Sequence, residues 1–164
     1  MGKGKKIGIG VLVLLVVIQF IHPTKNITAG EAVNRVETVY PVSPELKQVL
    51  AKSCNDCHSN NTTYPWYNNI QPVAWWLNHH VNEGKAELNF DEFAAYSPRR
   101  QYHKLEETEE MVANGEMPLN SYTWTHGDAV LNEAEKALLI NWTKDFRKSL
   151  EAKYPIDSLV RPKR

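Results

Sequence analysis

The sequence predicts an all-α fold. Apolar residues recur at helical spacing in successive segments, and several of these segments begin at a residue type that commonly caps a helix. No segment alternates between apolar and polar residues as a half-buried strand would, and no internal repeat is visible. The chain has 164 residues, which is enough for one domain.

The amino terminus is typical of an export signal or a membrane anchor. Met1 to Lys6 is basic, and Ile7 to Ile21 is almost entirely apolar. No convincing cleavage site follows this stretch, so we expect residues 1–25 to be an uncleaved signal anchor, with a cleaved signal peptide as the alternative. The basic flank should stay in the cytoplasm, which places the rest of the chain in the bacterial periplasm, tethered to the inner membrane or soluble after cleavage.

The remaining residues divide into three parts. Residues 26–43 are mixed in composition and are expected to form a linker. Residues 44–153 are expected to form the domain, and residues 154–164 a short tail. The first helix of the domain should begin at Pro44, with Ser43 as its N-cap.

Three more helices are expected. One begins near Pro72 and ends before Gly84, after a solvated loop over residues 59–71. The next is framed by Ser97 and Gly115. The last is capped by Asn132, and its apolar residues recur every four positions. These residues are Ala134, Leu138, Trp142, Phe146 and Leu150.

The chain's two cysteines lie in a Cys-x-x-Cys-His pattern, formed by Cys54, Cys57 and His58. This is the local signature of c-type haem attachment, in which both thiols bond to one porphyrin and the adjacent imidazole lies beneath the iron. Two alternatives are a thiol–disulfide redox pair and half of a zinc site. A redox pair of this kind usually lies beside a parallel sheet, which the sequence does not predict. A zinc site needs a second ligand pair at zinc-finger spacing, which the sequence lacks.

A second axial ligand should come from elsewhere in the chain, and Met117 is the best candidate. It lies between two expected helices and precedes Pro118, which restricts the local backbone. A thioether there would favour reduced iron, although a methionine that merely fills a gap in the core is the simpler interpretation. The rival ligands are His79, His80, His103 and His126.

The sequence resembles the bacterial haem-binding domain family of short cytochrome c-like proteins over residues 40–150. The matching features are residues 54–60, the Tyr-Pro-Trp-Tyr stretch at 64–67, residues 70–73 with Trp75 and Trp76, and the Gly-Glu-Met-Pro element at 115–118. The resemblance implies a cytochrome c-like helical domain wrapped around one haem, with its first and last helices packed together. It also implies that His58 is the proximal iron ligand and Met117 the distal one. The segment Tyr64–Phe93, with its paired histidines, departs from ordinary single-haem cytochromes.

One-electron transfer is the leading functional hypothesis, because an iron with both axial positions filled has no site for substrate. Redox proteins would be the partners. The alternatives are a peroxidase-like enzyme with a histidine acid–base group and a gas or redox sensor with a displaceable Met117. Nucleic acid is not expected as a partner, since removing the four lysines of residues 1–25 leaves 15 basic against 19 acidic residues.

Two groups of residues are expected to be structural. Four aromatic side chains should pack in the core or against haem, namely Trp66, Trp75, Trp142 and Phe146. Four acidic side chains are expected to form a solvated helix face, with a docking patch for a basic partner as the alternative. They are Glu106, Glu107, Glu109 and Glu110.

Overall fold

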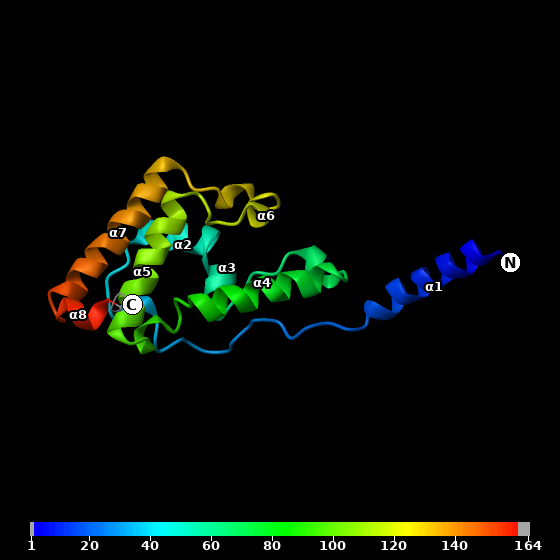
Figure 1. Cartoon of the computed structure of the whole chain (residues 1–164), viewed down its shortest axis with the longest axis horizontal. Helices are drawn as coiled ribbons and strands as arrows, with labels where there is room; N and C mark the ends of the chain where they lie inside the picture. The colour runs from blue at the N-terminus through cyan, green and yellow to red at the C-terminus, as the bar shows by residue number, and fades with distance from the viewer. Residues whose placement is uncertain (1, 161–164) are drawn as a thin grey trace.

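The computed structural model describes residues 2–160, and over that range it contains helices and connecting segments but no β-strand (Figure 1). The α-helices are α1 (Lys3–Ile18), α2 (Pro44–Ser53), α3 (Asn55–His58), α4 (Val73–Glu87), α5 (Pro98–Ala113), α6 (Asn120–Thr123), α7 (Glu133–Glu151) and α8 (Ile156–Leu159). The 3₁₀ helices are η1 (Val36–Thr38), η2 (Trp66–Asn69), η3 (Phe93–Ala95) and η4 (Gly127–Ala129). The all-α prediction is confirmed.

The core lies where α5 and α7 run side by side and where α2 packs against α7 (Figure 1). Each of these helices presents an apolar stripe to the others, and removing such stripes from water is the main favourable term in folding. Side chains from all three are almost completely buried, among them Leu46, Leu105, Leu139 and Phe146. Helix α4 extends from this core toward the amino-terminal end of the molecule (Figure 1).

The predicted helix starts are confirmed. The Ser43 side chain accepts a hydrogen bond from the backbone N–H of Leu46, and Ser97 caps α5 in the same way. Asn132 and Glu135 form a reciprocal capping box at the start of α7. Each of these bonds satisfies a backbone donor that the first turn of a helix leaves unpaired.

The predicted inward face of α7 is partly wrong. Ala134 is exposed and Leu138 is only half-buried, whereas Leu139 is completely buried. The buried positions of α7 are Leu139, Trp142, Thr143, Phe146 and Leu150. They are spaced by three and four residues because an α-helix has 3.6 residues per turn, so a strict spacing of four drifts off the buried face.

Residues 26–43 pack along the domain, although we expected them to form a linker. Val36 is buried in the core, and its N–H donates to the carbonyl of Phe90 (2.8 Å). The indole N–H of Trp142 donates to the carbonyl of Pro41 (2.9 Å). In the expected tail, α8 buries Leu159 and contacts α5; residues 161–164 lie outside the described range.

The apolar amino-terminal stretch forms α1, none of whose residues is buried. Among residues 2–160, no helix is both long and apolar enough to cross a membrane, so the structure does not support the predicted transmembrane helix.

Candidate functional site

The cysteine–histidine motif lies on a single turn at the end of α2. Cys54 ends α2, and its backbone leaves the regular helical conformation. Its carbonyl then accepts hydrogen bonds from the N–H groups of Cys57 (3.1 Å) and His58 (2.9 Å). This turn, α3, brings the three candidate residues together, with both thiols free and half-buried.

The His58 ring is held by the segment that follows α4. Its Nδ1 lies 2.9 Å from the carbonyl oxygen of Leu88, and its own backbone carbonyl accepts a bond from the N–H of Phe90 (2.8 Å). A carbonyl can only accept, so we infer that Nδ1 carries the proton and that Nε2 keeps a free lone pair. This is the arrangement that histidine ligands of metals usually show, and it fits an axial ligand of haem iron.

The surroundings of His58 favour its neutral form. Burial lowers the pKa of His58, and the nearby Lys104 charge adds a smaller effect in the same direction. Hydrogen bonds to the carbonyls of Leu88 and Gly84 oppose this shift. Only neutral imidazole can bind a metal, so the shift favours ligation.

The two thiols are held protonated. Burial, helped by the charge of Cys57, raises the pKa of Cys54 to about 12. Burial and then the Asp56 carboxylate raise the pKa of Cys57 to about 11. Thiol–disulfide exchange needs a thiolate at neutral pH, so this environment disfavours the redox-pair interpretation. Within residues 2–160, no three His, Cys, Asp or Glu side chains are grouped to hold a metal ion, and the zinc interpretation gains no support.

Gly84 has a role that the sequence analysis missed. We expected α4 to end before it, but α4 continues to Glu87. A Cβ atom at this position would lie 2.7 Å from the carbonyl oxygen of Cys57 and 2.9 Å from its Cβ. The glycine therefore lets α4 pack directly against the cysteine turn. An isolated glycine inside a helical pattern can be a sign of such a close approach.

A hydrogen-bond network fixes the residues just after the motif. Asn60 donates its backbone N–H to Asp91 (2.9 Å) and its side-chain amide to Glu92 (2.8 Å). The Asn89 amide donates in turn to the Asn60 side-chain oxygen (2.8 Å). Residues 88–92 thus hold His58 and Asn60, the second residue after it. The expected solvated loop, 59–71, is partly buried as a result.

Met117 comes from a separate element, the turn after α5. Gly115 adopts a left-handed conformation (φ 71°). The N–H of Glu116 donates to the carbonyl of Met111 (2.9 Å), and that of Gly115 to Val112 (3.2 Å). These bonds form a Schellman motif, which ends α5 and directs the half-buried Met117 away from the helix.

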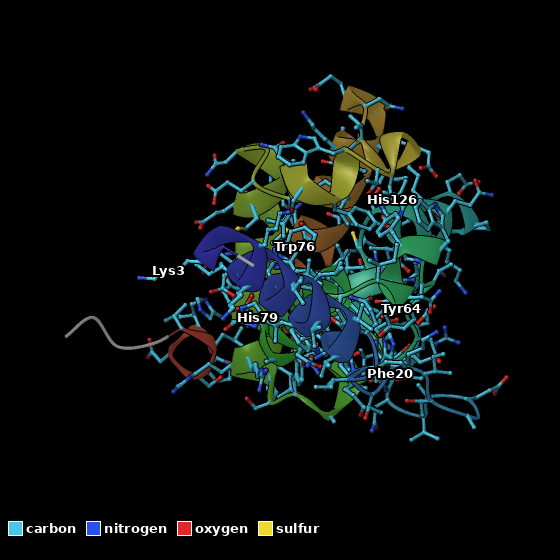
Figure 2. The ribbon with its side chains drawn as sticks, turned by 90° about the vertical axis from the view of Figure 1, so that its right-hand side faces the viewer. Lys3, Phe20, Tyr64, Trp76, His79 and His126 are labelled. Carbon is cyan, nitrogen blue, oxygen red and sulfur yellow. The ribbon has the colours of Figure 1, made fainter. Side chains whose placement is uncertain are left out.

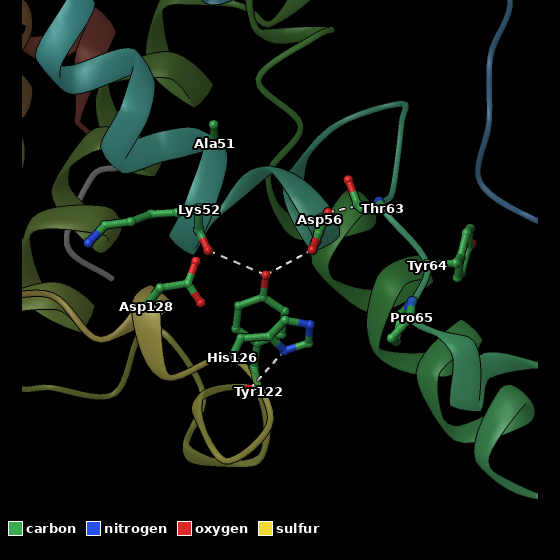
Figure 3. Close-up of a pocket in the computed structure, with 9 residues that line it drawn as sticks. All are labelled: Ala51, Lys52, Asp56, Thr63, Tyr64, Pro65, Tyr122, His126 and Asp128. Atoms are coloured by element: carbon green, nitrogen blue, oxygen red, sulfur yellow. Dashed lines mark hydrogen bonds between the residues drawn. The ribbon is translucent and has the colours of Figure 1, made fainter.

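Five residues further on, Tyr122 links the Met117 segment to the cysteine turn. Its hydroxyl donates to Asp56 (2.8 Å), with the Lys52 carbonyl as a second acceptor at 3.3 Å (Figure 3). His126 stacks on the Tyr122 ring, with centroids 4.2 Å apart. A hollow of about 260 Å³ opens here, lined by Ala51, Lys52, Asp56, Thr63, Tyr64, Pro65, Tyr122, His126 and Asp128. None of Cys54, Cys57 and His58 lines it, so it lies beside the candidate haem site.

The rival histidines have local partners. His79 pairs with Glu83 (3.2 Å), and His103 with Glu107 (3.1 Å). His80 packs edge-on against Trp76. His126 stacks on the ring of Tyr122, as described above. The buried residues of α4 are Ala74 and Val81, so neither of the paired histidines faces the core.

Two of the four expected packing aromatics are exposed. Trp142 and Phe146 are buried in the core, as predicted. Trp66 is 75% exposed and Trp75 is 38% exposed, so neither packs in the core. That they pack against haem stays a prediction. Local periodicity does not report which end of a helix extends beyond the core.

Three of the four acidic side chains in the run, Glu106, Glu107 and Glu109, form ion pairs. Arg147 bonds Glu106 (2.9 Å) and contacts Glu109 (3.5 Å), and Lys104 pairs with Glu107 (2.6 Å). These contacts agree with the solvated-face interpretation, since the basic partners on α5 and α7 offset much of the charge.

Comparison with known proteins identifies the family. A family model described as a haem-binding domain matches residues 13–145, beginning inside α1 and ending inside α7. No curated protein and no solved structure matches the chain. The match covers most of the chain. It includes the cysteine turn, Met117, and the residues Leu88 and Phe90 that bond His58. The chain therefore belongs to the haem-binding domain family.

Proposed function

We propose that this haem-binding protein carries one covalently attached c-type haem and transfers single electrons. The observation that supports this most strongly is the geometry of α3. Two protonated thiols and an imidazole with a free Nε2 occupy one turn, and the imidazole is oriented by the carbonyl of Leu88. A bound haem would supply a reversible Fe(II)/Fe(III) couple.

Cys54 and Cys57 would form the covalent attachment. Each thiol would add across one porphyrin vinyl group, its sulfur bonding to one vinyl carbon and its hydrogen going to the other. No external oxidant or reductant is needed for this addition. The break in the helix at Cys54 places both sulfurs on the same turn as His58.

His58 and Met117 would supply the axial ligands. Leu88 and Phe90 fix the orientation of His58, while the Schellman turn at Gly115 brings Met117 out of α5. With both residues bound, the iron would have no position left for a substrate, which favours electron transfer over substrate chemistry. The thioether would stabilise the reduced state.

The amino-terminal segment supports a location outside the cytoplasm. Its basic start and apolar helix would direct the domain to the periplasmic side of a bacterial inner membrane. We propose that redox proteins at this membrane are the electron donor and acceptor. Proximity to the membrane would raise the local concentration of the domain at such partners.

The test is expression of the full chain together with a cytochrome c maturation system. We expect a pyridine haemochrome spectrum with both vinyl groups saturated, and pigment that stays with the protein in acid-acetone. Colourless protein, or pigment that acid-acetone removes, would overturn the covalent assignment.

The axial ligands are tested separately. His58→Ala should abolish stable low-spin haem, and Met117→Ala should convert a low-spin spectrum to a high-spin one. Met111→Ala is the matched control, because this methionine is exposed on α5 and should leave the spectrum unchanged. A Met117→Ala spectrum identical to that of the wild type would remove Met117 as ligand.

A further inference from the structure

Helix α1 has no protein partner in the described chain, although its part from Ile7 to Ile18 is apolar on every side. Its large side chains from Ile7 to Val17 are about half or more exposed. A helix that packs on another protein needs an apolar stripe on one face only, whereas a helix that is apolar all round is stable only where apolar material surrounds it. Lysines flank the apolar stretch, at positions 3, 5 and 6 before it and at 25 after it.

The end of this apolar stretch is bonded to the start of α4. Gln19 and Gln71 exchange two hydrogen bonds, from the Gln71 N–H to Gln19 (2.9 Å) and from the Gln19 amide to the Gln71 carbonyl (3.2 Å). The Gln71 amide and the Trp75 indole N–H both donate to the carbonyl of Ile21 (2.7 and 3.0 Å). Gln71 is buried, so its own bonds to Gln19 and Ile21 are partly shielded from water. They fix the direction of α1 relative to the domain.

The same junction carries exposed apolar side chains, which we call the aromatic edge: Phe20, Trp66, Ile70 and Trp75. Phe20 is 83% exposed and Trp66 is 75% exposed. Figure 2 turns this side of the molecule toward the reader, with Lys3 and Phe20 near the two ends of the apolar stretch. Tryptophan rings with a bonded N–H and an exposed apolar face are typical of the boundary between lipid and water.

We propose that the aromatic edge lies in the headgroup region of the phospholipid bilayer that takes up α1, so that the domain contacts the membrane in one orientation. The all-round apolar surface of α1 fits lipid better than a protein groove, and the flanking lysines match anionic headgroups. This inference rests on the proposed membrane location and is independent of the haem. In this orientation, the start of α4 lies at the membrane, and the core formed by α5 and α7 lies away from it (Figure 1).

The test uses the full-length haem-loaded protein with liposomes of saturated phosphatidylcholine and phosphatidylglycerol. Hydroxyl-radical footprinting, read by mass spectrometry, measures the oxidation of each tryptophan with and without liposomes. We expect oxidation of Trp66 and Trp75 to fall severalfold on membrane binding. Tyr154, whose oxidation is read in the same spectra, is the control, because it is 40% exposed and directly precedes α8, at the end of the molecule opposite α1 (Figure 1). Its oxidation should not change.

A variant tests the role of the junction. Gln71→Glu keeps the size of the side chain but removes its donor to Ile21; it should still float with liposomes while losing protection of Trp66. Protein that fails to float with liposomes would overturn the proposal, even if a haemochrome assay shows covalent haem. Equal oxidation of Trp66 with and without lipid would also overturn it. So would protection that increases with protein concentration in the absence of lipid, since a second copy would then cover the edge.

Discussion

The two ends of α4 have opposite surroundings. Near its carboxyl end, Gly84 lies against Cys57, and the chain continues into the buried residues Leu88 and Phe90. At its amino end, Trp75 and Trp76 are partly exposed. The segment Tyr64–Phe93 therefore has two parts with different roles. Its second half positions the candidate iron ligand, and its first half forms a surface, so substitutions at the two ends should have very different effects.

The largest effect is expected at Phe90, which is buried against Phe93 and lies edge-on to His58. Phe90→Ala should lower the free energy of unfolding by about 3–5 kcal/mol, because it leaves a cavity in the core. Urea denaturation of the apoprotein measures this change. Phe20→Ala is the matched control, since Phe20 is 83% exposed and its loss should cost no more than about 0.5 kcal/mol. Similar losses for the two variants would refute the contrast.

A smaller loss is expected for Gly84→Ala. Helix propensity alone predicts that alanine stabilises α4 by about 1 kcal/mol. The new Cβ would meet the backbone of Cys57, however, and overpacking of this kind costs about 1–3 kcal/mol. We expect a net loss of stability and a lower yield of covalent haem. Gly127→Ala serves as the control because a Cβ there meets nothing within 4 Å. A Gly84→Ala protein more stable than the wild type would show that α4 and α3 are not in close contact.

Tyr122→Phe should have a moderate, pH-dependent effect. Losing the bond to Asp56 should cost about 1 kcal/mol at neutral pH. Burial, and then the hydrogen bond and charge of Asp56, raise the pKa of Tyr122. The unfolded chain therefore loses this proton first, so the stabilisation is complete below about pH 10 and declines above it. Denaturation curves should show wild type and variant converging above that pH; a constant difference would contradict the shift.

The smallest effect is expected for Trp66→Ala. Because the side chain is mostly exposed and lies far from the buried end of α4, the free energy of unfolding should change by no more than about 0.5 kcal/mol. Differential scanning calorimetry can measure this change. A loss of several kcal/mol would mean that Trp66 packs in the domain, as the sequence first suggested.

The sequence predicted what depends on local rules. Ser43, Ser97 and Asn132 identified the starts of helices because a cap needs only a few neighbouring residues. The Cys-x-x-Cys-His pattern identified the candidate site for the same reason, since its three residues lie within one turn.

What depends on distant contacts was missed. Gly84 resembled a helix terminator, and only the packing of α4 on α3 explains it. Leu88 and Phe90 carry no motif, yet they hold His58 because the chain returns to it from the end of α4. Trp66 and Trp142 are chemically alike but differ in burial, because their positions relative to the core are set by the fold as a whole.

The bond from Trp142 to Pro41 joins residues 101 positions apart, and Tyr40 stacks on Phe146 beside it. Helix α2 also packs against α7, so this part of its apolar surface is covered only after the last long helix has been synthesised. During translation, residues 54–58 emerge well before α7, so the cysteine turn is accessible while the polypeptide is still incomplete. The proposed covalent attachment of haem can thus precede the packing of α7, which completes the core.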